Sequence, residues 1–156
     1  MALAREHARG KAAGAAPSNA LIVAADTVVD LDGVALGKPQ DRAEAQAMIE
    51  RLSGREHLVH TAFALRSDAL GRTIDCLETT RVRFAVLDSA TIAAYVQSGD
   101  GLDKAGAYGI QGFGATLVEW IEGDYFTVVG FPLSAFARAL PQVGYVLRPR
   151  ALGVPA

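Results

Sequence analysis

A carboxylate and a lysine stand close together in the stretch LIVAADTVVDLDGVALGKP, which runs from Leu21 to Pro39. Asp26 follows the apolar strand predicted over residues 21–25, and Lys38 lies in a Gly-Lys-Pro turn twelve residues later. A strand needs neither group to fold. Ligands of helix-flanked sheets bind beyond the carboxyl ends of strands, so we expect Asp26 to face a ligand. The alternative is that Asp26 caps a turn or forms a surface ion pair.

Lysine is scarce in this chain. Of 15 basic residues only three are lysines, and these are Lys11, Lys38 and Lys104. Each lies among small residues, in GKAAG, LGKPQ and LDKAGAYG. Codon bias toward arginine would leave a few lysines by chance. The alternative is that a compact ammonium is needed where the planar guanidinium of arginine would not fit. Phosphate oxygens are then the expected ligands.

The glycine-rich stretch Asp103–Gly114 carries polar groups that could contact a ligand, among them Lys104 and Gln111. Glycines allow positive φ angles and a close approach of backbone N–H groups. A flexible loop is one interpretation. The aromatic and aliphatic side chains of Tyr108 and Ile110 favour an ordered loop, which is where binding groups are commonly displayed.

Other candidate groups are predicted to be structural. LGKPQ lacks the remaining residues of a phosphate-binding P-loop, and GFGATL lacks the third glycine of a dinucleotide fingerprint. His57 and His60 are three residues apart on a strand and therefore face opposite sides, without a third metal ligand. Cys76 has no candidate base and is expected in the core. Arg81 and Arg83 are expected on a solvated strand face.

Composition narrows the class of protein. At 156 residues, with 51% hydrophobic and 21% charged residues, the chain has the size and composition of a single globular domain over residues 1–156. No apolar run is long enough to predict a membrane span, and one cysteine is typical of a reducing compartment, so we expect a cytoplasmic protein. A net charge of −2 argues against nucleic acid as a partner. A small anion bound by local cations remains possible.

Hydrophobic periodicity and turn residues predict interleaved strands and helices. Asp41, with Glu44 three residues later, is typical of a helix N-terminus, and Asp32-Gly33 indicates a hairpin turn. We therefore expect an α/β fold with a mixed β-sheet flanked by helices. The expected elements are a helix over 2–15, strands over 21–25, 57–65 and 73–87, a hairpin over 28–36, helices over 41–54 and 90–97, strands over 116–123 and 125–129, and a last helix from Pro132.

Several separate motifs resemble one known family. AADTVVDLDGVALGKPQDRAEAQAMIERLSGREHLVHTAFAL and LDKAGAYGIQGFGATLVEWIEGDYFTVVGFPL closely resemble the Maf family of nucleoside triphosphate pyrophosphatases, in family order. The resemblance implies a fold shared with inosine triphosphate pyrophosphatases. It also implies hydrolysis of the α–β phosphoanhydride with a divalent cation, Mg or Mn, and a possible homodimer. It further implies that this chain lacks the family's N-terminal strand and phosphate-binding loop.

The resemblance assigns roles to residues that match family motifs. Asp26 of ADT matches the proton acceptor, which could also touch the metal, and Lys38 of GKP matches an active-site lysine. Lys104, with Asp103, matches DKAG. Lys11 is matched to the lysine of the family's A-x-E-K-A helix, although the segment here reads AREHARGKA.

Base choice is implied by two further matches. Thr27 and Gln111 correspond to positions associated with the nucleobase, and this pair resembles the branch that acts on dTTP and UTP. Two alternatives remain open. One is the same reaction on 7-methyl-GTP or another modified nucleotide. The other is a nucleotide-binding or cell-division protein without turnover.

Overall fold

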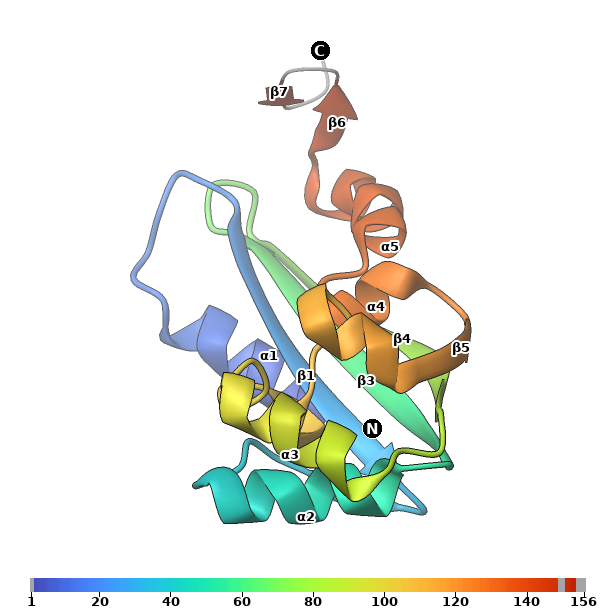
Figure 1. Cartoon of the computed structure of the whole chain (residues 1–156). Coiled ribbons are helices and arrows are strands. Elements are labelled where there is room, and N and C mark those ends of the chain that lie inside the picture. The colour runs from blue at the N-terminus through green and yellow to red at the C-terminus, as the bar shows by residue number, and fades with distance from the viewer. Residues whose placement is uncertain (1, 149–150, 154–156) are drawn as a thin grey trace.

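The computed structural model describes residues 2–148 and 151–153. Five antiparallel strands form the main sheet in the order β2-β1-β3-β4-β5, and β6 and β7 form a separate pair (Figure 1). The strands are β1 Ile22–Leu31, β2 Val34–Leu36, β3 Glu56–Ser67, β4 Arg72–Phe84, β5 Val118–Glu122, β6 Val146–Arg148 and β7 Ala151–Gly153. The helices are α1 Ala2–Gly14, α2 Arg42–Leu52, α3 Ser89–Ser98, α4 Tyr125–Val129 and α5 Leu133–Ala139, with 3-10 turns η1 Ala105–Ala107, η2 Gly112–Leu117 and η3 Leu140–Val143.

The α/β architecture with helices flanking a sheet is confirmed. Every strand pairing among the described residues is antiparallel, where a mixed sheet was expected. The interleaving of helices suggested parallel crossovers, yet the segment that contains α3 returns the chain antiparallel to β4. In the same described part, no helix has the length and apolar character required to cross a membrane.

One prediction of local structure was wrong in its extent, and another was wrong in its type. The strand expected at 21–25 extends through Asp26 to Leu31, and Val23 is 43% exposed because this half of β1 has no β2 partner and lies at the sheet edge. The segment Tyr125–Val129 is helix α4 instead of a strand. Its aromatic and β-branched residues favour a strand, but the Asp124 side chain accepts a hydrogen bond at the N-terminus and Gly130 ends the helix in a left-handed conformation.

The β1–β2 hairpin and helix α2 form where their turn and cap residues predicted them. Asp32 and Gly33 both have positive φ between β1 and β2. The Asp41 side chain accepts from the backbone N–H of Glu44 at 2.9 Å, as predicted. The Glu44 carboxylate accepts from the N–H of Gln40 at 2.7 Å, one residue before the cap. The loop that carries Lys38 is therefore fixed by strand pairing before it and by the helix cap after it.

Helix α1 covers one face of the sheet through a stripe of small residues. Ala4, Ala8 and Ala12 recur every four residues, are almost completely buried, and pack against Ala62 and Ala64 of β3. Because methyl groups meet on both sides, the helix lies close to the strands. This short distance brings polar side chains on the flank of α1 within reach of β1.

Arg66 of β3 holds the C-terminal end of α1. Its guanidinium donates hydrogen bonds to the carbonyls of Ala12, of Ala13 at 3.1 Å and of Ala15 at 2.8 Å, and it also pairs with Asp68. Carbonyls at a helix C-terminus lack partners within the helix and carry partial negative charge, so a cation is favourable there. A short alanine helix with two glycines is thereby anchored to the sheet.

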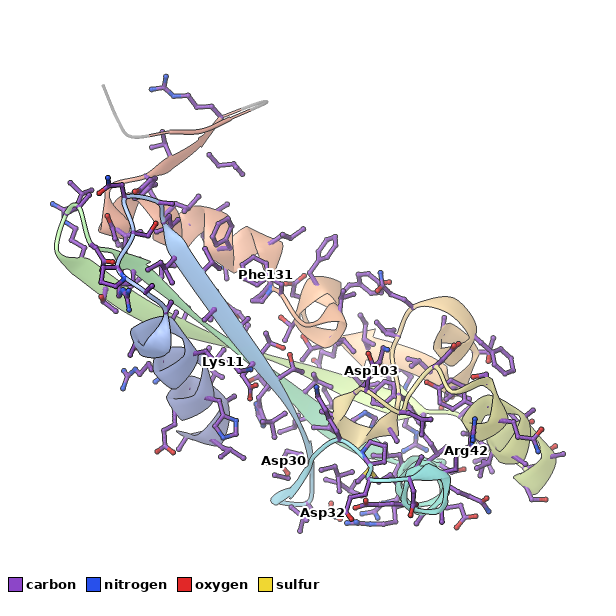
Figure 2. All side chains as sticks on the ribbon, turned by 90° about the vertical axis from the view of Figure 1, so that its left-hand side faces the viewer. Lys11, Asp30, Asp32, Arg42, Asp103 and Phe131 are labelled. Carbon is purple, nitrogen blue, oxygen red and sulfur yellow. The ribbon has the colours of Figure 1, made fainter. Side chains whose placement is uncertain are left out.

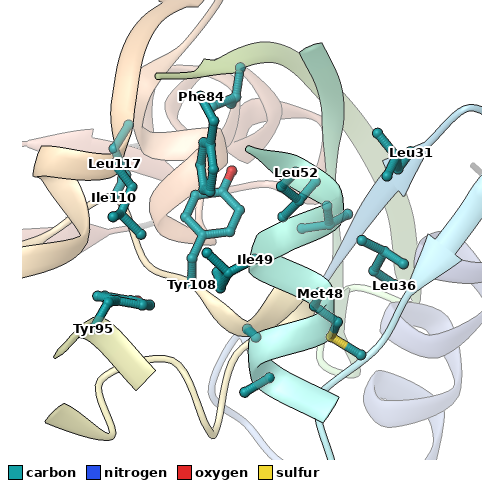
Figure 3. Close-up of a cluster of buried hydrophobic side chains, with 14 of the residues drawn as sticks. Leu31, Leu36, Met48, Ile49, Leu52, Phe84, Tyr95, Tyr108, Ile110 and Leu117 are labelled. Atoms are coloured by element: carbon teal, nitrogen blue, oxygen red, sulfur yellow. The ribbon is translucent and has the colours of Figure 1, made fainter. Parts of the chain in front are cut away.

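The opposite face of the sheet is covered by α2, α3 and the loop after α3, and further along by α5. Figure 3 shows the ring of Tyr108 close to Phe84 and Ile49 in this cluster. The Tyr108 hydroxyl is 2.7 Å from Nε2 of His57, and the two rings are edge-on at 5.4 Å. The loop is therefore ordered through its aromatic residue, and His57 is structural as expected. The main residues of the cluster are Val29, Leu31, Leu52, Val59, Val82, Tyr95 and Leu117.

The tight contact of α1 predicts a size limit at Ala8, which is completely buried. Ala8→Leu should lower the free energy of unfolding by about 1–3 kcal/mol because the larger side chain forces α1 away from β3. Ala13→Leu makes the same change on the exposed side of α1 and should be near neutral. Equilibrium unfolding in urea measures both, and equal effects of the two variants would contradict this packing.

Burial of His57 predicts acid sensitivity. Desolvation lowers the pKa of His57 from 6.5 to about 4, so the folded protein keeps the ring neutral where the unfolded chain binds a proton. The contribution of the neutral His57 ring to the free energy of unfolding is fully present above about pH 6.5 and is lost as the pH falls toward 4. Between about pH 7 and 5 the loss should be about 2 kcal/mol. In urea unfolding, His57→Gln should show a pH dependence smaller by that amount, and an unchanged pH dependence would contradict the assignment.

Candidate functional site

One cavity of about 1030 Å³ gathers the candidate residues. They come from distant parts of the sequence: α1, β1, the loop before α2, and the loop after α3. Figure 2 shows Lys11 and Asp103 on either side of β1. All six predicted site residues line the cavity, and these are Lys11, Asp26, Thr27, Lys38, Lys104 and Gln111.

The cavity passes around the edge of β1. Asp26 and Thr27 are consecutive residues of a strand, so their side chains point to opposite faces of the sheet. The register pairs Asp26 with Ala62, beneath α1, and Thr27 with Thr61, on the opposite face. Strand β2 pairs with β1 only from Val29 onward. The preceding edge of β1 is therefore open to the cavity, and one ligand could contact side chains from both faces.

The Asp26 carboxylate has two partners on α1. Oδ1 accepts from Nζ of Lys11 at 2.6 Å, and Oδ2 is 2.9 Å from Nδ1 of His7. An ionised carboxylate only accepts hydrogen bonds, so Nδ1 of His7 is the donor in this contact. Lys11 also donates to the carbonyl oxygen of Ala25 at 3.1 Å. The Asp26 side chain is only 17% exposed, and its orientation is fixed by these contacts.

The other two lysines lie on adjoining loops. The carbonyl of Gly37 accepts from the N–H of Gly106 at 3.0 Å, which joins the loop of Lys38 to the loop of Lys104. Nζ of Lys104 donates to Oδ1 of Asp103 at 2.5 Å. This hydrogen bond, with the attraction of Lys104 and a smaller one from Lys38, lowers the pKa of Asp103 below its usual value. Two lysines, Lys38 and Lys104, therefore lie on this side of the cavity together with the carboxylates of Asp100 and Asp103.

Tyr95 of α3 fixes the loop that carries Lys104. Its hydroxyl accepts from the N–H of Gly109 at 3.2 Å, and the ring is 1% exposed. A Cβ at Gly109 would lie 2.9 Å from Cδ of Lys104, so the absence of a side chain lets the lysine stem pass over the loop backbone. Burial of the Tyr95 ring raises the pKa of its hydroxyl, which stays protonated.

Sequence analysis missed two residues of this site. His7 lies four residues before Lys11, on the same face of α1. That spacing was readable from the sequence once both were placed on a helix flank beside the buried alanines. Tyr95 gave no such signal, because its partner Gly109 is contacted through the backbone. Cys76, expected in the core, is half-buried in β4, and burial raises the pKa of its thiol.

The residues of the cavity could hold a metal ion only if a bound ligand supplied further oxygen ligands to it. Among the described residues, no three His, Cys, Asp or Glu side chains are grouped as metal ligands. Mg²⁺ is commonly held by one or two carboxylates together with substrate phosphates and water. The Asp26 carboxylate faces the cavity with lone pairs left over after its two contacts, which suits this mode of binding.

Comparison with known proteins decides the family. A family model described as Maf-like protein matches residues 1–143. This chain belongs to the Maf family. The resemblance noted in the sequence motifs is therefore confirmed, and the matched range contains all the candidate residues of the cavity.

Several similar proteins carry the same name. A protein named dTTP/UTP pyrophosphatase from Thermus thermophilus is 53% identical over 133 residues, which make up 85% of this chain and 69% of that relative. Proteins of the same name from Fusobacterium nucleatum and Symbiobacterium thermophilum are 46% and 51% identical over 127 residues, or 81% of this chain. These matches cover 66% and 64% of the two relatives, so the Maf chain spans about two thirds of their length.

The lysines of this Maf chain predict binding of a polyphosphate at the cavity. Lys38→Gln should weaken binding of inorganic tripolyphosphate about tenfold, because one charge-assisted hydrogen bond is lost. Arg51→Gln removes the same charge from the exposed side of α2, outside the cavity, and should leave affinity unchanged. Titration calorimetry measures both. Equal weakening by both variants would indicate general attraction to net charge instead of a site.

Proposed function

We propose that this Maf protein is a nucleoside triphosphate pyrophosphatase that hydrolyses dTTP and UTP to the monophosphate and pyrophosphate. The name shared by the similar relatives supports the reaction and the substrates. The observation that carries the proposal is that one oriented carboxylate, Asp26, and all three lysines of the chain line the same cavity. We also propose that the enzyme acts in the cytoplasm.

The chemical task is attack by water on a phosphorus atom shielded by negative charge. A triphosphate chain carries about four negative charges, and more charge moves toward the leaving pyrophosphate as the α–β bond breaks. Lys38 and Lys104, on the joined loops, would neutralise the phosphate chain. Lys104 would exchange Asp103 for phosphate oxygens, since a 2.5 Å contact to an exposed carboxylate is readily replaced.

Asp26 is the proposed proton acceptor. Its carboxylate has about four lone-pair directions, of which His7 and Lys11 use two. The remaining directions are available to orient the attacking water and to accept its proton. His7 and Lys11 hold the carboxylate from α1, and Lys11 is also proposed to contact the phosphate chain.

A divalent cation, Mg or Mn, is the proposed cofactor. When bound, it would polarise the phosphoryl oxygens and offset charge on the leaving group. Asp26 is the protein residue proposed to hold it, with the substrate phosphates supplying other oxygen ligands. Thr27 and Gln111 are the residues proposed to contact the base.

A substrate panel tests the proposed base preference. Pyrophosphate release from dTTP and UTP should exceed release from 7-methyl-GTP when each is supplied at the same concentration with Mg²⁺. Faster release from 7-methyl-GTP would assign the protein to the other proposed substrate class. Binding of dTTP without release would support a nucleotide-binding protein that does not turn over.

The role of Asp26 predicts a large effect of Asp26→Asn. The amide keeps the size of the side chain but cannot accept the proton, so kcat for dTTP should fall by about 10²–10⁴-fold. The melting temperature should change little, because the side chain lies at a cavity. Pyrophosphate release at the rate of the unaltered protein would remove Asp26 from this role.

Asp75 provides a matched control. It lies on β4, is 14% exposed, and pairs with Arg5 and Arg9 of α1, much as Asp26 pairs with His7 and Lys11. Asp75→Asn therefore removes a similar ion pair between α1 and the sheet outside the cavity. We expect its kcat to remain within about twofold, with a change in stability of about 1 kcal/mol or less. An equal loss of kcat in both variants would mean that docking of α1, and not proton transfer, explains the effect.

A further inference from the structure

Three threonines form a hydrogen-bonded chain behind the cavity wall. Oγ1 of Thr27 lies 2.9 Å from Oγ1 of Thr61, and Oγ1 of Thr61 donates to the carbonyl oxygen of Thr127 at 2.7 Å. Thr61 and Thr127 are completely buried, whereas Thr27 lines the cavity. The chain of hydrogen bonds therefore leads from Thr127 in α4, through β3, to a side chain that a ligand can touch.

The number of protons on these hydroxyls determines which group donates and which accepts in each hydrogen bond. A threonine hydroxyl has one proton to donate and two lone pairs. The carbonyl of Thr127 only accepts, so the single proton of Thr61 is used on it. Thr61 can then only accept from Thr27, and the proton of Thr27 points away from the cavity. Toward the cavity, Thr27 presents lone pairs.

The carbonyl of Thr127 has a structural reason to keep this bond. Helix α4 has only five residues, and the carbonyls of its last turn have no partners inside the helix. Leaving a buried carbonyl unpaired costs about 1–3 kcal/mol. Gly130, which ends α4, also lines the cavity, and a Cβ there would lie 3.4 Å from Oγ1 of Thr27. The missing side chain leaves room for a ligand beside that hydroxyl.

We infer that Thr61 and the carbonyl of Thr127 hold Thr27 as a hydrogen-bond acceptor, so that the cavity selects a pyrimidine carrying an imide N–H. Uracil and thymine have this N3–H donor, whereas cytosine has a lone pair at N3 that the lone pairs of Thr27 repel. The amide of Gln111 can donate or accept and adapts to either base. Discrimination therefore comes from Thr27, and Thr61 is its positioning residue. This inference rests on the proposed function, since it describes the base half of the same site.

Binding of UMP and CMP tests the inference without requiring turnover. Calorimetry with the unaltered protein should give tighter binding of UMP than of CMP, and N3-methyl-UMP, which lacks the N–H, should bind at least about tenfold more weakly than UMP. Thr61→Val keeps the shape of the side chain but frees the Thr27 proton, so the ratio of CMP to UMP dissociation constants should fall about tenfold. Thr61→Ser keeps the hydroxyl and should restore the ratio.

Thr80 supplies the control for a purely structural role. Its hydroxyl, on a buried residue, donates to the carbonyl of Asp124 at 2.9 Å, at the N-terminus of α4, and its hydrogen bonds do not include Thr27. Thr80→Val should cost similar stability and leave the CMP to UMP ratio unchanged.

The possible outcomes separate the inference from the proposed function. Equal binding of UMP and N3-methyl-UMP, an unchanged ratio in Thr61→Val, or an equal shift in Thr80→Val would each overturn the inference. Selective binding of UMP without release of pyrophosphate from UTP would support it while overturning the proposed hydrolysis. Hydrolysis of UTP and CTP at equal kcat/KM, with equal binding of UMP and CMP, would leave the proposed reaction and overturn the inference.

Discussion

The contact of Asp26 with Lys11 and His7 is possible only because α1 lies very close to the sheet. Alanines on both sides of the contact set that distance, and Arg66 holds the end of the helix. A larger residue in the stripe would move both partners, Lys11 and His7, away from the carboxylate. The orientation of Asp26 therefore depends on small side chains that have no chemistry of their own. The geometry of the site is therefore set by the same packing that holds α1 on the sheet.

The open edge of β1 would let a single cavity hold both ends of the proposed nucleotide substrate. Successive residues of the strand point to opposite faces, so the proposed proton acceptor Asp26 and the proposed base contact Thr27 are separated by the strand itself. Loops that are joined through Gly37 and Gly106 bring Lys38 and Lys104 to the same space. A long polar ligand fits this arrangement better than a compact one, because the polar groups follow the edge of the strand.

Local signals in the sequence predicted much of the fold, and the limits have physical causes. The Asp32-Gly33 hairpin and the Asp41 cap depend on neighbouring residues, and both were predicted correctly. The segment Tyr125–Val129 was misjudged because its caps outweigh its strand propensity. Scarce lysines and motif matches pointed to residues that share a cavity, but Thr61 could not be found, since its importance lies in a hydrogen bond to a distant carbonyl. Such contacts exist only after β3 and α4 have packed together.

Acetylation of the three lysines tests the central claim most directly, because each can be followed separately by mass spectrometry. With a non-hydrolysable dTTP analogue and Mg²⁺ present, the rates at Lys11, Lys38 and Lys104 should all fall relative to the free protein, with one shared dependence on analogue concentration. Rates measured on the denatured chain give the reference for full reactivity. Protection of none of them, or of one lysine without the other two, would contradict a single polyphosphate site built around Asp26.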